Sequence, residues 1–161
     1  MDPIASRPHL SSDYGVPSDT DDLLPWSYVT DRMASAMHYW ISTVGSGGAP
    51  HTRPIAGIWL DDKIYFGGSP HSRWRRNLAS NPHACINLSE EGDQAIILHG
   101  TVHSLRPDRP LAIRLADASN TKYAYGQKPD DYEGEGIFVF RPSAAFAWKL
   151  LTKDRTRWHL R

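Results

Sequence analysis

The chain has 161 residues, in which 18 Lys and Arg balance 18 Asp and Glu, and 40% of its residues are hydrophobic. This length and composition are typical of one globular domain with a sizeable core. Zero net charge argues against sequence-independent duplex binding, which needs many phosphates to be neutralised. The chain has one Cys, Cys85, and a polar N-terminus, and no apolar run comes near the roughly 20 residues of a membrane-spanning helix. These features predict a cytoplasmic protein that binds neither nucleic acid nor membranes.

The charges are unevenly distributed along the chain. Residues 1–31 carry six Asp against Arg7 alone, whereas 71–78 and 149–161 are basic. The first 24 residues are rich in Pro, Ser and Asp and lack apolar periodicity, which predicts an extended acidic arm at 1–24 before a single domain at 25–161. Each basic cluster is either a solvated surface or an anion site.

In the first half of the domain, the sequence pattern predicts two helices and several strands. Apolar residues at three- and four-residue spacing from Val29 to Trp40, with Ser27 as the N-cap, predict a helix. The segments 38–44 and 51–60 flank a Gly- and Pro-rich turn and predict a hairpin. A short strand at 63–68 and a helix from about 70 to 80 follow, and Asn81-Pro82 ends that helix.

In the second half of the domain, the sequence pattern predicts mainly strands. Two of them, 83–89 and 94–105, flank a turn, and Pro107-Asp108 opens a third helix. An irregular stretch covers 120–135, and the chain ends with the predicted strands 136–142, 143–151 and 156–161. About seven strands and three helices joined by tight turns favour an antiparallel barrel over a doubly wound parallel sheet.

The passage 63–78 places two Gly, two Ser and three Arg at the start of a helix. Unpaired N–H groups and the helix dipole make such a start suitable for a phosphate, together with the Ser72 hydroxyl and an Arg fork. The same residues also fit a simpler interpretation, in which Ser69 caps the helix, Pro70 takes its first position and the arginines are solvated. Arg53, in an otherwise apolar strand, either reaches out of an edge or points at an anion.

An ordered series of segments covers most of the chain: YGVP (14–17), LLPWSYV (23–29), YWISTV (39–44), 48–68, SRWRRNLASNP (72–82), ILHGTV (97–102), VFRPSAAFAW (139–148) and TRWHLR (156–161). This series resembles the pyridoxamine-phosphate-oxidase-like split-barrel flavoproteins, which include the flavin- and deazaflavin-dependent oxidoreductases of actinobacteria. The resemblance implies a mainly β protein with a six-stranded antiparallel split β-barrel. It also implies a homodimer with FMN or the deazaflavin coenzyme F-420 in a groove at the subunit interface.

The resemblance also implies which residues meet the cofactor. The strand with Arg53 matches the family strand that meets the cofactor phosphate and ring, and Ser72 and Arg73 match the phosphate-binding positions. Trp74 stands where Lys is common in the family, so other arginines must supply the missing charge, while Trp74 and Trp148 are candidates for stacking on a planar ring. The predicted cofactor-binding residues are Arg53, Pro54, Ile55, Tyr65, Phe66, Gly67, Ser72, Arg73, Trp74, Arg76 and Trp148.

The predicted chemistry needs no catalytic side chain and no metal. A flavin or deazaflavin carries the hydride-exchanging atom itself, and the sequence has no nucleophile elbow, GxGxxG or HExxH. His99 and His103 would be about 13 Å apart on a straight strand, too far to share a metal ion. We expect an oxidoreductase that transfers hydride between FMN, or F-420, and a small conjugated substrate. The alternative is a non-catalytic split-barrel protein that binds or sequesters a cofactor or haem.

Overall fold

The computed structural model describes residues 2–9, 11–15, 18–88, 91–133 and 136–160. Within them the α-helices are α1 (Trp26–Ser35), α2 (Arg73–Ser80), α3 (Arg109–Tyr123) and α4 (Leu151–Asp154), and the 3-10 helices are η1 (Ser12–Tyr14) and η2 (Pro129–Tyr132). The strands are β1 (Ala5–Ser6), β2 (Tyr39–Val44), β3 (Pro50–Ile55), β4 (Ile58–Leu60), β5 (Lys63–Phe66), β6 (His83–Asn87), β7 (Ala95–Leu105), β8 (Ile137–Trp148) and β9 (Thr156–His159).

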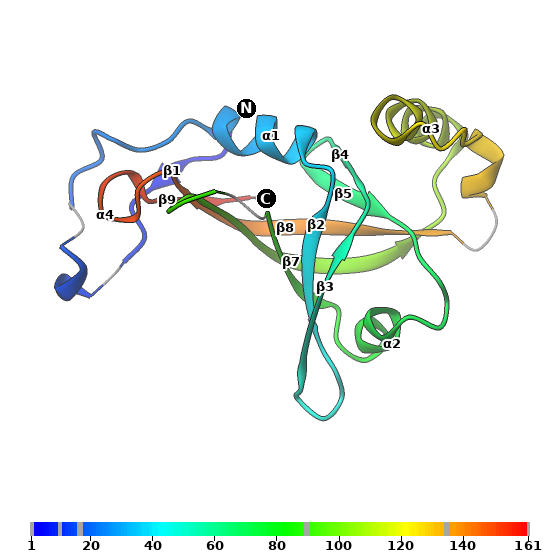
Figure 1. Cartoon of the computed structure of the whole chain (residues 1–161), viewed down its shortest axis with the longest axis horizontal. Coiled ribbons are helices and arrows are strands. Elements are labelled where there is room, and N and C mark those ends of the chain that lie inside the picture. The colour runs from blue at the N-terminus through cyan, green and yellow to red at the C-terminus, as the bar shows by residue number, and fades with distance from the viewer. Residues whose placement is uncertain (1, 10, 16–17, 89–90, 134–135, 161) are drawn as a thin grey trace.

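These strands form one antiparallel sheet with the order β1-β9-β8-β7-β6-β2-β3, and β5 pairs with both β4 and β8 (Figure 1). The described strands do not close into a complete barrel. The predicted mainly β split-barrel class is therefore confirmed, with the short α4 added to the three helices expected from the sequence.

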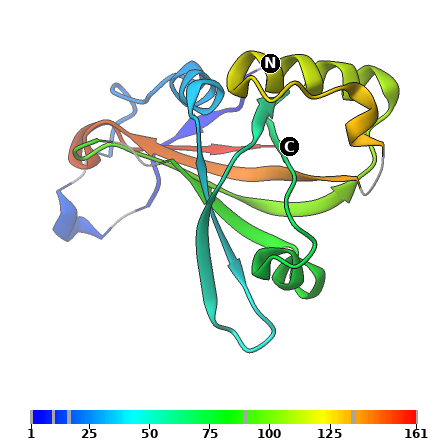
Figure 2. The same ribbon diagram turned by 45° about the vertical axis from the view of Figure 1, so that its right-hand side comes forward.

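The helices lie on both sides of the sheet. Helices α1 and α2 both pack into the main core on one face of the sheet, α2 next to the β2–β3 hairpin, while α3 packs on the other face against Ile137 and Val139 of β8 (Figures 1 and 2). The main core forms between α1 and the sheet and buries Met33, Tyr39, Phe140 and Trp158. A second cluster forms between α3, β4, β5 and the start of β8. Helix α3 thus has its own small core beside the main one.

The predicted helix from Ser27 to Trp40 is wrong at both ends. Pro25 occupies the N-cap position, and α1 ends at Ser35 because Ala36 adopts an extended conformation. Trp40 belongs to β2, where burial alternates strictly along the strand. The spacing of Met33, Met37 and Trp40 imitates a helix, but only Met33 of these three is both helical and buried.

The two strands expected at 136–142 and 143–151 are one strand, β8. Pro142 breaks the sequence pattern but not the strand, because it lies at a register shift where it opposes Gly100. A Cβ on Gly100 would come within 2.1 Å of the Arg141 carbonyl oxygen, so glycine is required for this close approach. After the bulge, β8 continues and changes its second neighbour from β5 to β9.

The other boundaries differ less from the expectation. Helix α2 begins at Arg73 instead of Pro70, and α3 continues to Tyr123, into the stretch expected to be irregular. Asp108 caps α3 by accepting a hydrogen bond from the Leu111 N–H at 3.0 Å, as Pro107-Asp108 predicts. Parts of the expected segments at 14–17, 83–89, 120–135 and 156–161 lie outside the described residues.

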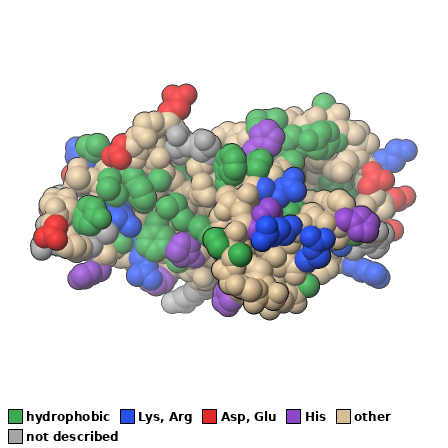
Figure 3. Space-filling model, turned by 60° about the horizontal axis from the view of Figure 1, so that its bottom comes forward, with side chains coloured by type: hydrophobic (Ala, Val, Ile, Leu, Met, Phe, Trp, Pro, Cys, Tyr) green, Lys and Arg blue, Asp and Glu red, His purple; other side chains and the backbone are tan. Residues whose placement is uncertain are grey.

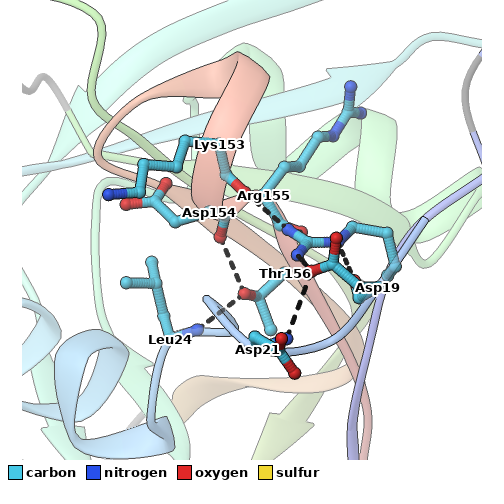
Figure 4. A network of polar contacts seen from close by, with 8 residues as sticks. Asp19, Asp21, Leu24, Lys153, Asp154, Arg155 and Thr156 are labelled. Atoms are coloured by element: carbon cyan, nitrogen blue, oxygen red, sulfur yellow. Dashed lines mark hydrogen bonds and ion pairs between the residues drawn. The ribbon is translucent and has the colours of Figure 1, made fainter. Parts of the chain in front are cut away.

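The acidic arm is attached to the sheet edge. Ala5 and Ser6 pair with β9, and the Arg7 guanidinium donates to the carbonyl oxygens of Asp19 at 2.9 Å and Lys153 at 2.8 Å. Where the arm meets α1, the Leu24 N–H donates to the Thr156 Oγ1 at 2.8 Å (Figure 4). The arm thus includes the short strand β1 and the 3-10 helix η1, and it is tied to the connection between β8 and β9.

Candidate functional site

The candidate site is built around the start of α2. Ser72 is the N-cap residue, and its N–H donates to the Ser69 carbonyl oxygen at 3.0 Å. Its side-chain Oγ is buried and has no hydrogen-bond partner among the described residues. Ser69 does not cap the helix, since its Oγ accepts from the His71 N–H. A buried hydroxyl without a partner costs free energy, so the site favours a ligand oxygen that accepts from Ser72.

The arginines around α2 are not equivalent. Arg75 donates to the Gly68 carbonyl oxygen at 3.0 Å and lies over the Phe138 ring, and Arg76 donates to the His71 carbonyl oxygen at 3.1 Å. Arg73 and Arg53 are exposed, and no described residue forms a hydrogen bond or an ion pair with either guanidinium. Arg73 and Arg53 are thus available to an anion, and the exposed Arg76 keeps its charge and its other N–H groups.

The β2–β3 hairpin brings Arg53 to the side of α2. Arg53 opposes Ile41, and Thr43 farther along β2 accepts a hydrogen bond from the Asn77 side chain of α2 at 3.0 Å. Figure 3 shows Lys or Arg and His side chains grouped on this face of the molecule. His51 shares the Arg53 face of β3, and its Nε2 is also buried without a partner among the described residues. The sequence places His51 only at the start of the predicted segment 51–60, so it is not among the predicted cofactor-binding residues.

Trp74 is in the core, not in a groove. Only 2% of Trp74 is exposed, and its ring packs against Phe66 at 5.3 Å and Phe138 at 5.1 Å between centroids. A Cβ on Gly68 would come within 2.7 Å of the Trp74 ring, so Gly68 makes room for the indole. The ring at this position, where the resemblance makes Lys common, is therefore packed among core side chains.

The other predicted residues of β3 and β5 have different environments. Ile55 is buried in the main core and Pro54 is exposed. Tyr65 packs in the cluster under α3, and burial raises the pKa of its hydroxyl. Phe66 is in the main core, while Gly67 is exposed at the end of β5. Gly67 and the neighbouring Gly68 thus expose backbone at this strand end.

Trp148 is not brought to the start of α2 within one chain. Phe138, which touches Trp74, and Trp148 lie at opposite ends of β8, about 33 Å apart at ~3.3 Å per residue. The Arg155 guanidinium lies 5.0 Å from the centre of the Trp148 ring. The predicted site residues are therefore divided between the two ends of the sheet.

The face of the sheet opposite the one that packs against α1 and α2 is apolar and only partly covered. Ile97 opposes Phe146, both are half-buried, and the Arg157 guanidinium lies over the Phe146 ring. Trp40, on the same face of β2, is 37% exposed. Hydrophobic side chains gather on the side of Figure 3 away from the basic group. Exposed apolar surface of this kind is typical of a protein interface.

The described residues contain no group of three or more His, Cys, Asp or Glu side chains that could hold a metal ion. None of their helices is long and apolar enough to cross a membrane.

Solved structures with this fold bind different cofactors. A FAD-binding protein from Mesorhizobium loti is 16% identical with a TM-score of 0.58, covering 86% of this chain and 96% of that chain. An F420 reductase is 18% identical with a TM-score of 0.55, covering 71% and 93%. A heme-binding protein from Mycobacterium smegmatis is 19% identical with a TM-score of 0.59, covering 80% and 56%. At such identities the likeness shows the fold alone.

No curated protein matches the sequence. The family model described as pyridoxamine 5'-phosphate oxidase matches residues 31–149, which is well over half of the chain. Strands β2 to β8 and the strand-to-helix passage at α2 lie within this match, while β1 and β9 lie outside it. The chain therefore belongs to the pyridoxamine 5'-phosphate oxidase family.

Proposed function

We propose that this protein is a flavin- or deazaflavin-dependent oxidoreductase that binds FMN, or alternatively coenzyme F-420, without a covalent bond. The observation that carries the proposal is the buried, unpartnered Ser72 hydroxyl at the start of α2, beside the available guanidinium of Arg73. Family membership and the FAD- and F420-dependent proteins with the same fold support it.

The residues around α2 fit the phosphate of such a cofactor. Ser72 donates its hydroxyl proton to a phosphate oxygen, the first N–H groups of α2 add their dipoles, and Arg73 and Arg53 supply positive charge. Arg53 and Arg73 replace the charge that Lys supplies in other family members, because the side chain at that position is the buried Trp74. When bound, the cofactor supplies the hydride chemistry.

We infer that two copies associate through the partly covered sheet face. Its apolar residues, including Phe146 and the exposed Trp40, support an interface on this side. In such a homodimer the cofactor lies between the subunits, with Ser72 and Arg73 from one copy and Trp148 from the other. This arrangement accounts for the separation of Trp148 from α2 within one chain.

The proposal is tested by the absorption spectrum of the purified protein, followed by titration with FMN and with F-420. A flavin band that NAD(P)H bleaches supports the FMN enzyme, and a colourless protein that binds reduced F-420 supports the deazaflavin enzyme. Failure to bind either cofactor contradicts the proposal.

Haem is a second candidate, because the heme-binding protein from Mycobacterium smegmatis shares the fold. A Soret band in the purified protein, or binding of haem without binding of FMN or F-420, supports this candidate. Binding of FMN or F-420 without turnover of any conjugated acceptor instead supports a cofactor carrier.

A further inference from the structure

A separate pocket of about 340 Å³ lies between the C-terminal half of α3, the segment that follows it, and the end of β5. Helix α3 contributes Leu115, Ser119 and Tyr123, which recur every four residues and so share one face. The opposite side includes Phe66 and Gly67, at the strand end that leads to Ser72. The pocket thus adjoins the strand that the resemblance assigns to the cofactor, but it is not the phosphate site.

The walls of this pocket suit a flat ring. Tyr123 and Tyr125 stack with their centroids 5.0 Å apart and their planes 11° apart, and both line the pocket. At the end of β5, Tyr65 and Phe66 also line the pocket, and no atom lies within 4 Å of the position of a Cβ on Gly67, so there is open space beside this glycine. Aromatic walls with open space at one glycine favour a planar ligand over a bulky one.

The pocket does not suit an anion. The described residues that line it include no Lys, Arg or His, and they include the carboxylate of Asp131, which accepts from the Lys128 N–H at 2.7 Å. The C-terminal end of α3 at Tyr123 carries the negative end of the helix dipole. Its wall is therefore neutral to negative.

The nearest cation does not change this conclusion. Lys122 packs behind the pocket, where its Nζ donates to the Tyr39 hydroxyl at 3.0 Å and to the Gly57 carbonyl oxygen at 3.2 Å. The same amine lies over the rings of Tyr39 and Tyr123. Gly57 and Tyr123 belong to the pocket wall, so the amine lies behind this wall and is engaged by it, and Lys122 itself does not line the pocket.

We propose that this pocket binds the substrate, and that the substrate is an uncharged planar aromatic molecule without a phosphate group. The proposal rests on the function proposed above, since it assigns the substrate to the strand end next to the cofactor. It separates this chain from the enzyme that gives the family its name, whose substrate carries a 5'-phosphate. A phosphorylated substrate would need a cation in the pocket, and the described lining provides none.

Calorimetric titration of the full-length protein with 2-naphthol and with 2-naphthyl phosphate tests the charge preference, because these probes differ only in the phosphate. We expect 2-naphthol to bind at least about ten-fold more tightly, since an unpaired phosphate is costly to desolvate. Equal or tighter binding of 2-naphthyl phosphate overturns the proposal.

Two variants of Tyr125 test the location. Removal of its ring in Tyr125→Ala weakens 2-naphthol binding by about five-fold, and Tyr125→Arg lets 2-naphthyl phosphate bind more tightly than 2-naphthol. Tyr14→Ala is the matched control, because Tyr14 is similarly exposed, at 56% against 62% for Tyr125, and lies in η1. If Tyr125→Ala and Tyr14→Ala bind 2-naphthol equally well, the pocket assignment is wrong.

Cofactor titration of the same protein separates the two proposals. Binding of FMN or F-420 without binding of 2-naphthol overturns the pocket and leaves the proposed function standing. Binding of 2-naphthol without binding of either cofactor overturns the proposed function, and with it the role of the pocket as a substrate site.

Discussion

The two basic clusters of the chain use their charges in different ways. In the C-terminal cluster, Arg155 and Arg157 lie over aromatic rings, and the carbonyl oxygen of Lys153 holds Arg7 of the acidic arm. In the α2 cluster, the Ser72 hydroxyl and the Arg73 guanidinium have no partner among the described residues. Similar local charge therefore supports packing at one end of the sheet and an anion site at the other. Buried polar atoms without a partner among the described residues occur in both clusters, since the Nε atoms of Arg155 and Arg157 are also in this state. The clusters differ because these two guanidiniums lie over aromatic rings, whereas Arg73 is exposed.

The largest effect is expected from removing Arg73 of the α2 cluster together with Arg53 of β3. The double variant Arg53→Ala, Arg73→Ala loses two charge-assisted contacts of about 1.5–3 kcal/mol each, so cofactor affinity falls by at least ~100-fold. Fluorescence titration measures this loss. Arg114→Ala, which removes an exposed ion pair with Asp61, is the control and leaves affinity unchanged. Unchanged affinity of the double variant would falsify the phosphate assignment.

Trp74→Ala separates packing from binding within the α2 cluster. Loss of a buried Trp ring costs about 3–5 kcal/mol of unfolding free energy and lowers the melting temperature by roughly 10 °C. Circular dichroism during heating measures the shift. Ile113→Ala, at a 43% exposed position on α3, is the control and changes little. A Trp74 variant with native stability and reduced cofactor affinity would show that the ring binds the cofactor instead.

Arg7→Ala tests the packing role of the C-terminal cluster. The variant loses hydrogen bonds to the carbonyl oxygens of Asp19, Lys153 and Arg155 and lowers the free energy of unfolding by about 1–3 kcal/mol. Urea denaturation measures the loss, and amide exchange of residues 2–9 speeds up. Arg7→Lys does not restore stability, because an ammonium lacks the planar fork. Reduced cofactor affinity with unchanged stability would contradict the contrast between the clusters.

The smallest effect concerns a cation outside both clusters. Burial lowers the pKa of Lys122 to about 8 from 10.5, so between these values the unfolded chain binds more protons than the folded one. The free energy of unfolding therefore rises with pH in this window, by at most about 1 kcal/mol between pH 7.5 and 9 because the amine is only half-buried. Urea denaturation at both pH values measures the rise.

Lys122→Met removes this contribution and is compared with the unmodified protein at each pH. The comparison is necessary because burial also raises the pKa of the Cys85 thiol and of the Tyr123 hydroxyl, which lowers stability at higher pH. Identical pH dependence in the two proteins would show that Lys122 keeps its ordinary pKa.

Local patterns were sufficient to predict most of the fold. The β2–β3 hairpin follows from its glycine-rich turn, and α3 follows from Asp108 and the apolar spacing after it. The continuity of β8 was not predictable, because it depends on Gly100 of another strand leaving room at Pro142. The end of α1 was also missed, since Trp40 satisfies a helical spacing while it packs as a strand residue.

The candidate site was only partly predictable. The resemblance pointed to Arg53, Ser72 and Arg73, which remain the predicted phosphate residues. Burial of Trp74 depends on Gly68, Phe66 and Phe138 together, and one sequence position does not reveal such a set. His51 carried no signal beyond a lone His near a turn. The pocket beside Tyr123 lay in a stretch expected to be irregular.

The central place of β8 has a consequence for how the chain folds. This strand pairs with β5, β7 and β9, and its contacts with β5 join residues as distant in sequence as Ile64 and Phe140. During synthesis, β5 and one edge of β7 remain without their neighbour until residues 137–148 leave the ribosome. Such distant pairings slow folding and leave unpaired edges exposed to other chains. Nascent chains that stop before β8 should therefore depend on chaperones, although they already contain every residue predicted to bind the cofactor phosphate.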